Sequence, residues 1–424
     1  MTSECFVYIV LPGATEFVTA GRFRVSDPRD GAPVGAFVYG RRYLARADAV
    51  ELDPVELRLA AGSYETARMG GFFGAIRDSM PDYWGRRVIE KHGGRGETAE
   101  FHYLLDGPDD RAGALGFGLG VEPPAPRRRF NRTLDLPRLQ AAADAILADE
   151  PARAGSARDQ VAELLLDGTS MGGARPKAVV QDDDALWLAK LGRRDDRWNH
   201  PRVEHALLLL ARECGIEVAD SRIDTIGGRD VLLVRRFDRD FAGSGYHRHR
   251  MVSALTLLQA EESPTARDRW SYLSLADEVR RASASPERDL RELFARMCFN
   301  AAVSNLDDHP RNHALLARGR AWRLSPAYDL TPMPTIAIDR RDLAMACGPQ
   351  GRFANRANIV SGAGRFLLSR TDGQAIFDRI VDVVRGSWHA AMRRVGVSDA
   401  DCATIAGAFL YDGLFYEPGR GAGP

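Results

Sequence analysis

The ten residues from 304 to 313 read SNLDDHPRNH and gather acids, amides and two histidines that could do chemistry. Asp307 and Asn312 stand five positions apart, in the pattern D-x-x-x-x-N. In this pattern the carboxylate can accept the proton of an attacking hydroxyl group, and the amide oxygen one loop turn later can bind magnesium. Many loops contain the pattern by accident, so the neighbouring segments have to show whether this loop is catalytic.

A second candidate metal ligand comes after a predicted β-hairpin. The segment ALLARGRAWRLSPAYDL ends in Asp329 and Leu330, and Asp329 lies seventeen residues after Asn312. One carboxylate oxygen and one amide oxygen suit Mg²⁺, which keeps its other positions for water and phosphate. The alternative is that Asp329 only caps the turn DLTPMP that follows it.

Two further features lie earlier in the chain. The stretch GTSMGGARPKA, residues 168–178, has small residues whose backbone N–H groups could approach phosphate oxygens, although it could also be an ordinary turn. Only three of the 58 basic residues are lysines, and Lys177 and Lys190 lie within fourteen residues of each other. Lysine and arginine are not equivalent at a phosphate-binding point, so the surviving lysines are candidates for one.

Lys190 lies in the apolar strand LWLAKL. A buried ammonium group needs a partner because its desolvation is costly. Glu204, on the next predicted helix, is the natural carboxylate for it. The alternative is a lysine on an edge strand that points to water.

The composition excludes several classes of protein. The chain has 424 residues, enough for two or three domains, and its net charge is zero, which gives no chain-wide attraction for nucleic acid. Five scattered cysteines without a CxxC pair fit a reducing cytosol rather than a disulfide framework. No apolar run of about 18 residues predicts a membrane span, and the N-terminus lacks the pattern of a secretory signal. We therefore expect a cytoplasmic protein.

The elements that must position these residues fall into two halves. The first half is rich in predicted strands and the second in predicted helices, and the two join near residues 236–250. Residues 121–137 read as a linker rich in Pro and Arg, although their run RRRFNR could also bind nucleic acid. The order of features is Gly-rich turn, strand lysine, helix glutamate, hairpin, helical region, D-x-x-x-x-N, hairpin and aspartate. This ordered set predicts a two-lobed phosphoryl transferase with a nucleotide in its cleft.

On these motifs the chain resembles the HipA-like serine/threonine kinases, the toxin half of bacterial type II toxin–antitoxin pairs. SMGGARPKA resembles the Gly-rich loop of that family, and LSPAYDL resembles its metal-binding strand end. NLDDHPRNH resembles its catalytic loop, usually N-x-D-x-H-x-K-N, with Arg311 in place of the lysine. VLLVRRFDR is similar to the strand that leads into the hinge, and MPDYWGRRVIEKH and LLDGPDDRAGALGF are similar to the N-terminal subdomain. The resemblance runs from roughly residue 30 to residue 390.

The resemblance implies a role for each matched position. Asp307 would be the catalytic base, His309 would support the catalytic loop, and Asn312 and Asp329 would bind Mg²⁺. Residues 235–238 would line the adenine end of the cleft, with arginine at 235 where some relatives have glutamate. The residues implied at the ATP site are Ser170, Gly172, Gly173, Ala174, Lys177, Lys190, Glu204, Arg235, Arg236, Phe237, Arg311, Asn312 and Asp329.

One of these positions would also carry regulation. Ser170 falls where the family has an autophosphorylated serine, with Thr169 next to it as the alternative acceptor. A phosphate there would add about two negative charges to a loop that must approach ATP, so it should silence the enzyme.

The resemblance also implies a fold and partners. We expect an α+β, two-lobed, protein-kinase-like fold with a strand-rich N-lobe, an N-terminal subdomain and a mainly helical C-lobe. The expected divisions are an N-terminal subdomain over residues 1–125, the rest of the N-lobe over 126–236, and the C-lobe over 237–424. Expected partners are a HipB-like helix-turn-helix antitoxin, operator DNA only through that antitoxin, and a protein substrate such as an aminoacyl-tRNA synthetase, with no membrane.

Three other interpretations remain open. His309 and His313 are spaced i,i+4 and could bind zinc in a metal-dependent hydrolase, although Pro310 lies between them and the glutamate of HExxH is absent. A pseudokinase that only binds or regulates is the second, and the intact set of Asp307, Asn312, Asp329 and Lys190 speaks against it. A kinase of the same fold acting on a lipid or small molecule is the third, without a basic amphipathic helix to favour it.

Overall fold

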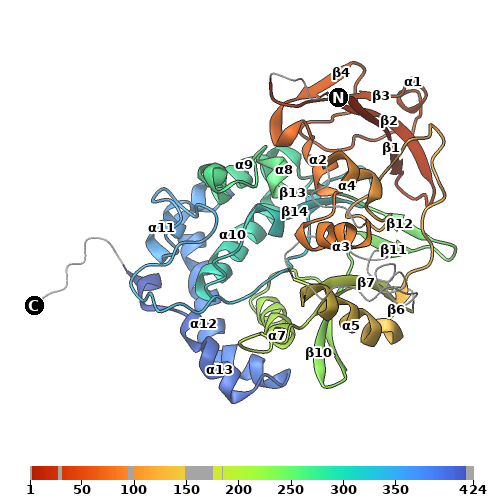
Figure 1. The fold of residues 1–424 in the computed structure, drawn as a ribbon. Helices are drawn as coiled ribbons and strands as arrows, with labels where there is room; N and C mark the ends of the chain where they lie inside the picture. The colour runs from red at the N-terminus through yellow and green to blue at the C-terminus, as the bar shows by residue number, and fades with distance from the viewer. Residues whose placement is uncertain (1, 27–30, 94–99, 149–174, 184, 417–424) are drawn as a thin grey trace, which may run out of the picture. The chain divides into compact units, whose positions relative to one another are not determined.

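Figure 1 shows the computed structural model of the chain, which describes residues 2–26, 31–93, 100–148, 175–183 and 185–416. The chain forms two compact units. Unit 1 consists of Met1–Arg193, Asp224–Thr256 and Leu316–Trp322, and unit 2 consists of Arg194–Ile223, Leu257–Leu315 and Arg323–Pro424. Unit 1 contains most of the strands and unit 2 most of the long helices, as expected for the predicted α+β class.

The elements of unit 1, in chain order, are β1 (Thr2–Val10), β2 (Phe17–Ser26), β3 (Val34–Tyr39), α1 (Arg41–Leu44), β4 (Ser63–Thr66), α2 (Gly74–Asp78), α3 (Tyr83–Gly93), α4 (Glu100–Asp106), β5 (Leu115–Gly118), β6 (Asn131–Arg132), α5 (Leu136–Leu147), β7 (Lys177–Asp182), β8 (Ala185–Leu191), β10 (Arg229–Arg235), β11 (Arg239–Phe241), β12 (Tyr246–Arg248) and β13 (Arg250–Ser253). The elements of unit 2 are α7 (His200–Glu213), α9 (Tyr272–Ala282), α10 (Pro286–Ala302), β15 (Arg323–Leu324), α11 (Arg356–Ser361), α12 (Arg370–Arg394) and α13 (Asp399–Ile405). Three elements, β9 (Ser221–Ile226), α8 (Ala254–Leu257) and β14 (Ala314–Ala317), contain residues of both units.

The first sheet of unit 1 has five strands in the order β4-β3-β2-β1-β5, and the strand pairs are antiparallel. Its core is aromatic. The fully buried ring of Phe23 lies 5.5 Å from that of Phe72 and 6.2 Å from that of Phe101, measured between centroids. Gly21 is needed beside this core, because a Cβ there would come within 2.3 Å of the Val38 carbonyl oxygen.

The second sheet of unit 1 has the order β6-β7-β8-β10-β9 and carries both described candidate lysines. One face is covered by apolar side chains of α3 and α5, which pack on alternate residues of β7, β8 and β10. Trp84 of α3 is buried there, and its indole N–H donates to the Lys177 carbonyl at 3.1 Å. The covered face therefore fixes the register of the strands, and with it the positions of the lysines on the other face.

Unit 2 is built around α10, which packs against α9 and α12, while α7 packs against α12 (Figure 1). Pro286 occupies the first turn of α10, where its missing N–H costs nothing. The last three turns of α10 are almost wholly buried, which agrees with the apolar stretch LFARMCFNAA. Among the described residues, no helix is both long and apolar enough to cross a bilayer.

Candidate active site

The loop that contains Asp307 begins directly where α10 ends. The N–H of Asn305 donates to the Asn300 carbonyl at 2.9 Å, and Ser304 takes a positive φ of 49°. Non-glycine residues are uncommon in this left-handed region, and such positions cluster at functional sites. The turn redirects the chain out of the buried helix and into the polar loop.

A buried polar network supports this loop from below. The amide of Asn305 donates to the Asn300 side chain at 3.1 Å, and the Asn300 amide donates to the Tyr272 hydroxyl at 3.0 Å. The Tyr272 hydroxyl donates to the carboxylate of Asp308, which also bonds to Nε2 of His313 at 2.9 Å. All five side chains are buried. Satisfied buried networks of this kind rigidify the segments that they join.

Asp307 lies on the other side of the loop from this network, because its neighbour Asp308 is 1% exposed whereas Asp307 itself is exposed. The Asp307 carbonyl accepts hydrogen bonds from the N–H of His309 at 2.8 Å and from the Asn312 side-chain amide at 3.3 Å. Asn312 is buried, and this bond holds its side-chain amide nitrogen toward the loop. The His309 ring lies near Trp270, with centroids 6.5 Å apart.

The segment that ends in Asp329 is joined to this loop at two points. The Tyr328 hydroxyl donates to the Arg311 carbonyl at 2.7 Å, and the N–H of Met333 donates to the Ser304 carbonyl at 2.9 Å. Asp329 itself has φ of 59°, in the left-handed region that aspartate and asparagine tolerate best. Residues next to Asn312 and next to Asp329 are therefore in direct contact, although seventeen positions separate the two candidate ligands.

The loop does not present the two histidines as one helical face. Residues Pro310–Asn312 form a single 3₁₀ turn, and His309 and His313 on either side of it have extended backbone. His313 is buried against Asp308 and Tyr272. Among the described residues, no group of three or more His, Cys, Asp or Glu side chains could hold a metal ion. The i,i+4 zinc arrangement is therefore not formed.

In unit 1, Lys177 and Lys190 are cross-strand partners on β7 and β8, and Leu232 of β10 continues the same row. The Lys177 ammonium pairs with Asp82 at 3.1 Å, and both side chains are under 10% exposed. Asp82 also accepts from the N–H of Gly85 at 2.8 Å in the first turn of α3. Lys190 is half-buried in the centre of the sheet.

Residues 235–238 follow β10. The N–H of Arg236 donates to the Leu186 carbonyl at 2.8 Å, and its guanidinium bonds to Asp238 and to the carbonyls of Asp110 and Arg111. Burial alone would raise the pKa of Asp238, but Arg236 and Arg239 outweigh it and hold that pKa well below its usual range. The Arg236 side chain is thus committed to contacts within unit 1. Arg235 is exposed and Phe237 is half-buried.

Comparison with known proteins decides the family. The model of the HipA-like C-terminal domain matches residues 169–388, more than half of the chain. This chain belongs to the HipA-like C-terminal domain family. Every predicted site residue lies inside the matched segment, and the resemblance inferred from the motifs is confirmed.

Two relatives extend the comparison. "Putative kinase Y4mE" of Sinorhizobium fredii is 31% identical to this HipA-like chain over 143 residues, which are 32% of each protein, so the match spans about a third of that relative. A chain of the Shewanella oneidensis MR-1 toxin–antitoxin complex of HipA, HipB and operator DNA matches with a TM-score of 0.64 and 16% identity. That match covers 95% of this chain and 94% of the other. The two chains therefore share a fold, and the predicted HipA-like fold is confirmed.

Some of the predicted HipA-like site residues cannot be placed. The Gly-rich residues Thr169, Ser170, Gly172, Gly173 and Ala174 lie outside the described residues. Glu204 is buried on α7 of unit 2, whereas Lys190 belongs to unit 1, so the pair predicted between them stays a prediction.

The structure adds three residues that the sequence analysis did not select. Asp82 neutralises Lys177, Tyr328 joins the two loops, and Glu262 forms an ion pair with Arg311. The start of a helix after Pro81 is a recognisable position for a capping aspartate, so Asp82 had a local signal. Nothing in the sequence around Glu262 marks it as a partner of the loop.

Proposed function

We propose that this chain is an ATP- and Mg²⁺-dependent serine/threonine protein kinase of HipA type. The proposal rests on one observation above all: the hydrogen bond from Tyr328 to the Arg311 carbonyl, 2.7 Å long, joins the Asp307–Asn312 loop to the Asp329 segment. It is supported by membership of the HipA-like family and by a relative named as a kinase. Phosphoryl transfer needs a base and metal ligands, and in this proposal Asp307, Asn312 and Asp329 supply them.

Each residue has a defined task in this proposal. The exposed Asp307 carboxylate would accept the proton of the substrate hydroxyl as its oxygen attacks the terminal phosphorus, while the bond from that phosphorus to the bridging oxygen breaks and ADP leaves. The Asn312 amide oxygen and the Asp329 carboxylate hold Mg²⁺, and Lys190 binds the nucleotide phosphates. When bound, ATP supplies the phosphoryl group and Mg²⁺ offsets the charge on its phosphates. One amide and one carboxylate fit this ion because Mg²⁺ takes few protein ligands and completes its shell with water and phosphate.

The substrate and partners are carried over from the family resemblance. We propose a protein substrate such as an aminoacyl-tRNA synthetase, and a HipB-like antitoxin that holds operator DNA. The Shewanella HipA was solved with HipB and operator DNA, which supports an antitoxin partner here. We also propose autophosphorylation on Ser170, with Thr169 as the alternative acceptor.

The test is to incubate the purified chain with labelled ATP and Mg²⁺, alone and with cell lysate, and to locate phosphoserine and phosphothreonine by mass spectrometry. Transfer to Ser170 or to a lysate protein is the expected result. Parallel incubation with lipid vesicles separates a lipid kinase from a protein kinase. Absence of transfer to every acceptor, with ATP still bound, would establish a pseudokinase instead.

A further inference from the structure

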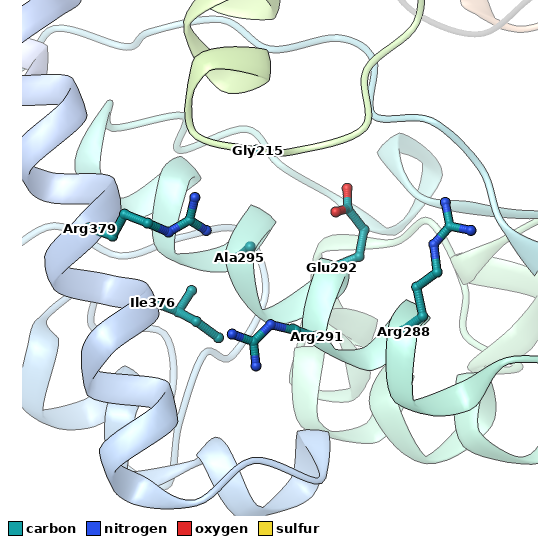
Figure 2. A pocket seen from close by; sticks show the side chains of 7 residues that line it. All are labelled: Gly215, Arg288, Arg291, Glu292, Ala295, Ile376 and Arg379. Carbon is teal, nitrogen blue, oxygen red and sulfur yellow. The ribbon is translucent and has the colours of Figure 1, made fainter.

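A pocket of about 290 Å³ lies in unit 2, where the loop after α7 meets α10 and α12 (Figure 2). None of the residues that line it belongs to the candidate active site. The lining residues are Gly215, Arg288, Arg291, Glu292, Ala295, Ile376 and Arg379. Figure 2 shows the Arg291 side chain extending from α10 toward Ile376 of α12, and Arg379 further along the same helix, α12.

The charge of this lining is positive, with three arginines against one glutamate. The glutamate is already neutralised, because Glu292 accepts from Arg296 at 3.0 Å and from the N–H of Glu217 at 3.0 Å. Arg288 forms an exposed ion pair with Glu217 at 2.9 Å, and exposed pairs of this kind contribute little. The carboxylates of Glu292 and Glu217 are therefore already paired with arginines.

Two arginines retain donors for a ligand. Arg291 is exposed and forms no hydrogen bond or ion pair with any residue in the described part of the chain. Arg379 donates from Nη1 to the Cys214 carbonyl at 2.7 Å, which orients its guanidinium across the pocket. Because this bond also satisfies the carbonyl at the end of α7, the negative end of that helix is partly offset at this point.

Glycine at 215 allows the Arg379 guanidinium to approach the backbone closely. Gly215 has φ of +80°, in the left-handed region, and a Cβ there would come within 3.0 Å of the Arg379 guanidinium. Ala295 lies one turn from Arg291 on α10, Ile376 lies one turn from Arg379 on α12, and both apolar side chains are buried. Each helix thus contributes an arginine and a neighbouring apolar side chain to the pocket.

We propose that this pocket binds a small phosphorylated metabolite, with its phosphate on Arg291 and Arg379 and its carbon part against Ala295 and Ile376. Arginine is suited to phosphate because its planar fork donates two parallel hydrogen bonds. The volume of about 290 Å³ is close to the lower end of the range for small-molecule pockets, roughly 300–1,000 Å³, which favours a small metabolite over a macromolecule. The site does not depend on the proposed kinase activity.

The test is isothermal titration calorimetry on the wild-type chain and on two variants, Arg291→Gln and Arg385→Gln. Each protein is titrated with ribose 5-phosphate, with inorganic phosphate and with ribose. Arg385 is the matched control, since it is an exposed arginine of α12 that pairs with Asp382 at 3.1 Å, outside the pocket. Repeating the titration with Lys190→Gln removes the ammonium group that is proposed to bind phosphates at the candidate active site.

We expect saturable binding of ribose 5-phosphate, tighter than that of inorganic phosphate, and none of ribose. Arg291→Gln should weaken it by about tenfold or more, the cost of removing a charged hydrogen-bond donor. Arg385→Gln and Lys190→Gln should leave it within about twofold, as expected for changes outside the pocket. Equal binding by the Arg291 and Arg385 variants would overturn the site, and so would loss of binding in Lys190→Gln. Equal affinity for the two phosphates would overturn the assignment of an organic phosphate.

Discussion

Lys177 and Lys190 lie directly opposite each other on β7 and β8, so two of the three lysines of the chain share one face of a sheet. Like charges in this position repel each other. The carboxylate of Asp82, 3.1 Å from the Lys177 ammonium, offsets this repulsion at one of the two positions. The strand register therefore places Lys190, which is proposed to bind the nucleotide phosphates, beside a lysine whose charge is already offset by Asp82.

Asp82→Asn should destabilise the chain by about 3 kcal/mol, because removal of one partner leaves a buried ammonium group without its carboxylate. Urea unfolding measures the change in the free energy of unfolding. Asp183→Asn is the control, since Asp183 is exposed in the turn between the same two strands. An equal, small effect of both substitutions would show that the ion pair contributes little.

Asp307→Asn should lower phosphoryl transfer by about 10²–10⁴-fold, the usual contribution of a general base, with nucleotide binding retained. Its stability should hardly change, because Asp307 is exposed. Asp308→Asn should do the opposite and destabilise the chain by about 1–3 kcal/mol, since it disturbs the buried bonds to Tyr272 and His313. Transfer assays and thermal unfolding on both variants separate the two effects. Retained transfer in Asp307→Asn would assign the base to another residue.

Asp329→Asn should weaken Mg²⁺-dependent nucleotide binding by about tenfold or more, since even the loss of a residue that only supports a metal ligand costs that much. Asparagine tolerates the positive φ at this position, so the backbone should be preserved and the loss can be assigned to the charge. The measurement is nucleotide affinity as a function of Mg²⁺ concentration. An unchanged Mg²⁺ dependence would remove Asp329 from the metal site.

Asp53 should make stability depend on pH. It is fully buried, and burial together with nearby Glu56 raises its pKa from 3.8 to about 6, against hydrogen bonds from three backbone N–H groups. Between those two pH values the folded chain binds a proton that the unfolded chain does not, so this contribution to stability rises as pH falls. Relative to Asp53→Asn, the wild type should gain about 2 kcal/mol between about pH 7.5 and about pH 4. Parallel stability curves for the two proteins would show that Asp53 has an ordinary pKa.

The ordered motifs were readable because each depends on local spacing. The D-x-x-x-x-N loop follows a recognisable apolar stretch, and α10 does precede it in the structure. Lys190 was predicted inside a strand and lies in β8. Alternation and helical periodicity act over a few residues, so they survive in the sequence without knowledge of the fold.

The family, the α+β class and the candidate residues can be predicted from the amino-acid sequence alone, because they follow from residue types at short separations. Three features become visible only in the folded chain: which of two adjacent aspartates faces outward, the pairing of Asp82 with a lysine 95 residues away, and the bond by which Tyr328 joins the two loops. Adjacent aspartates have the same local signal, and their exposure depends on which side packs against Tyr272 and His313. Pairings across long separations depend on strand register and helix packing, which no local pattern encodes.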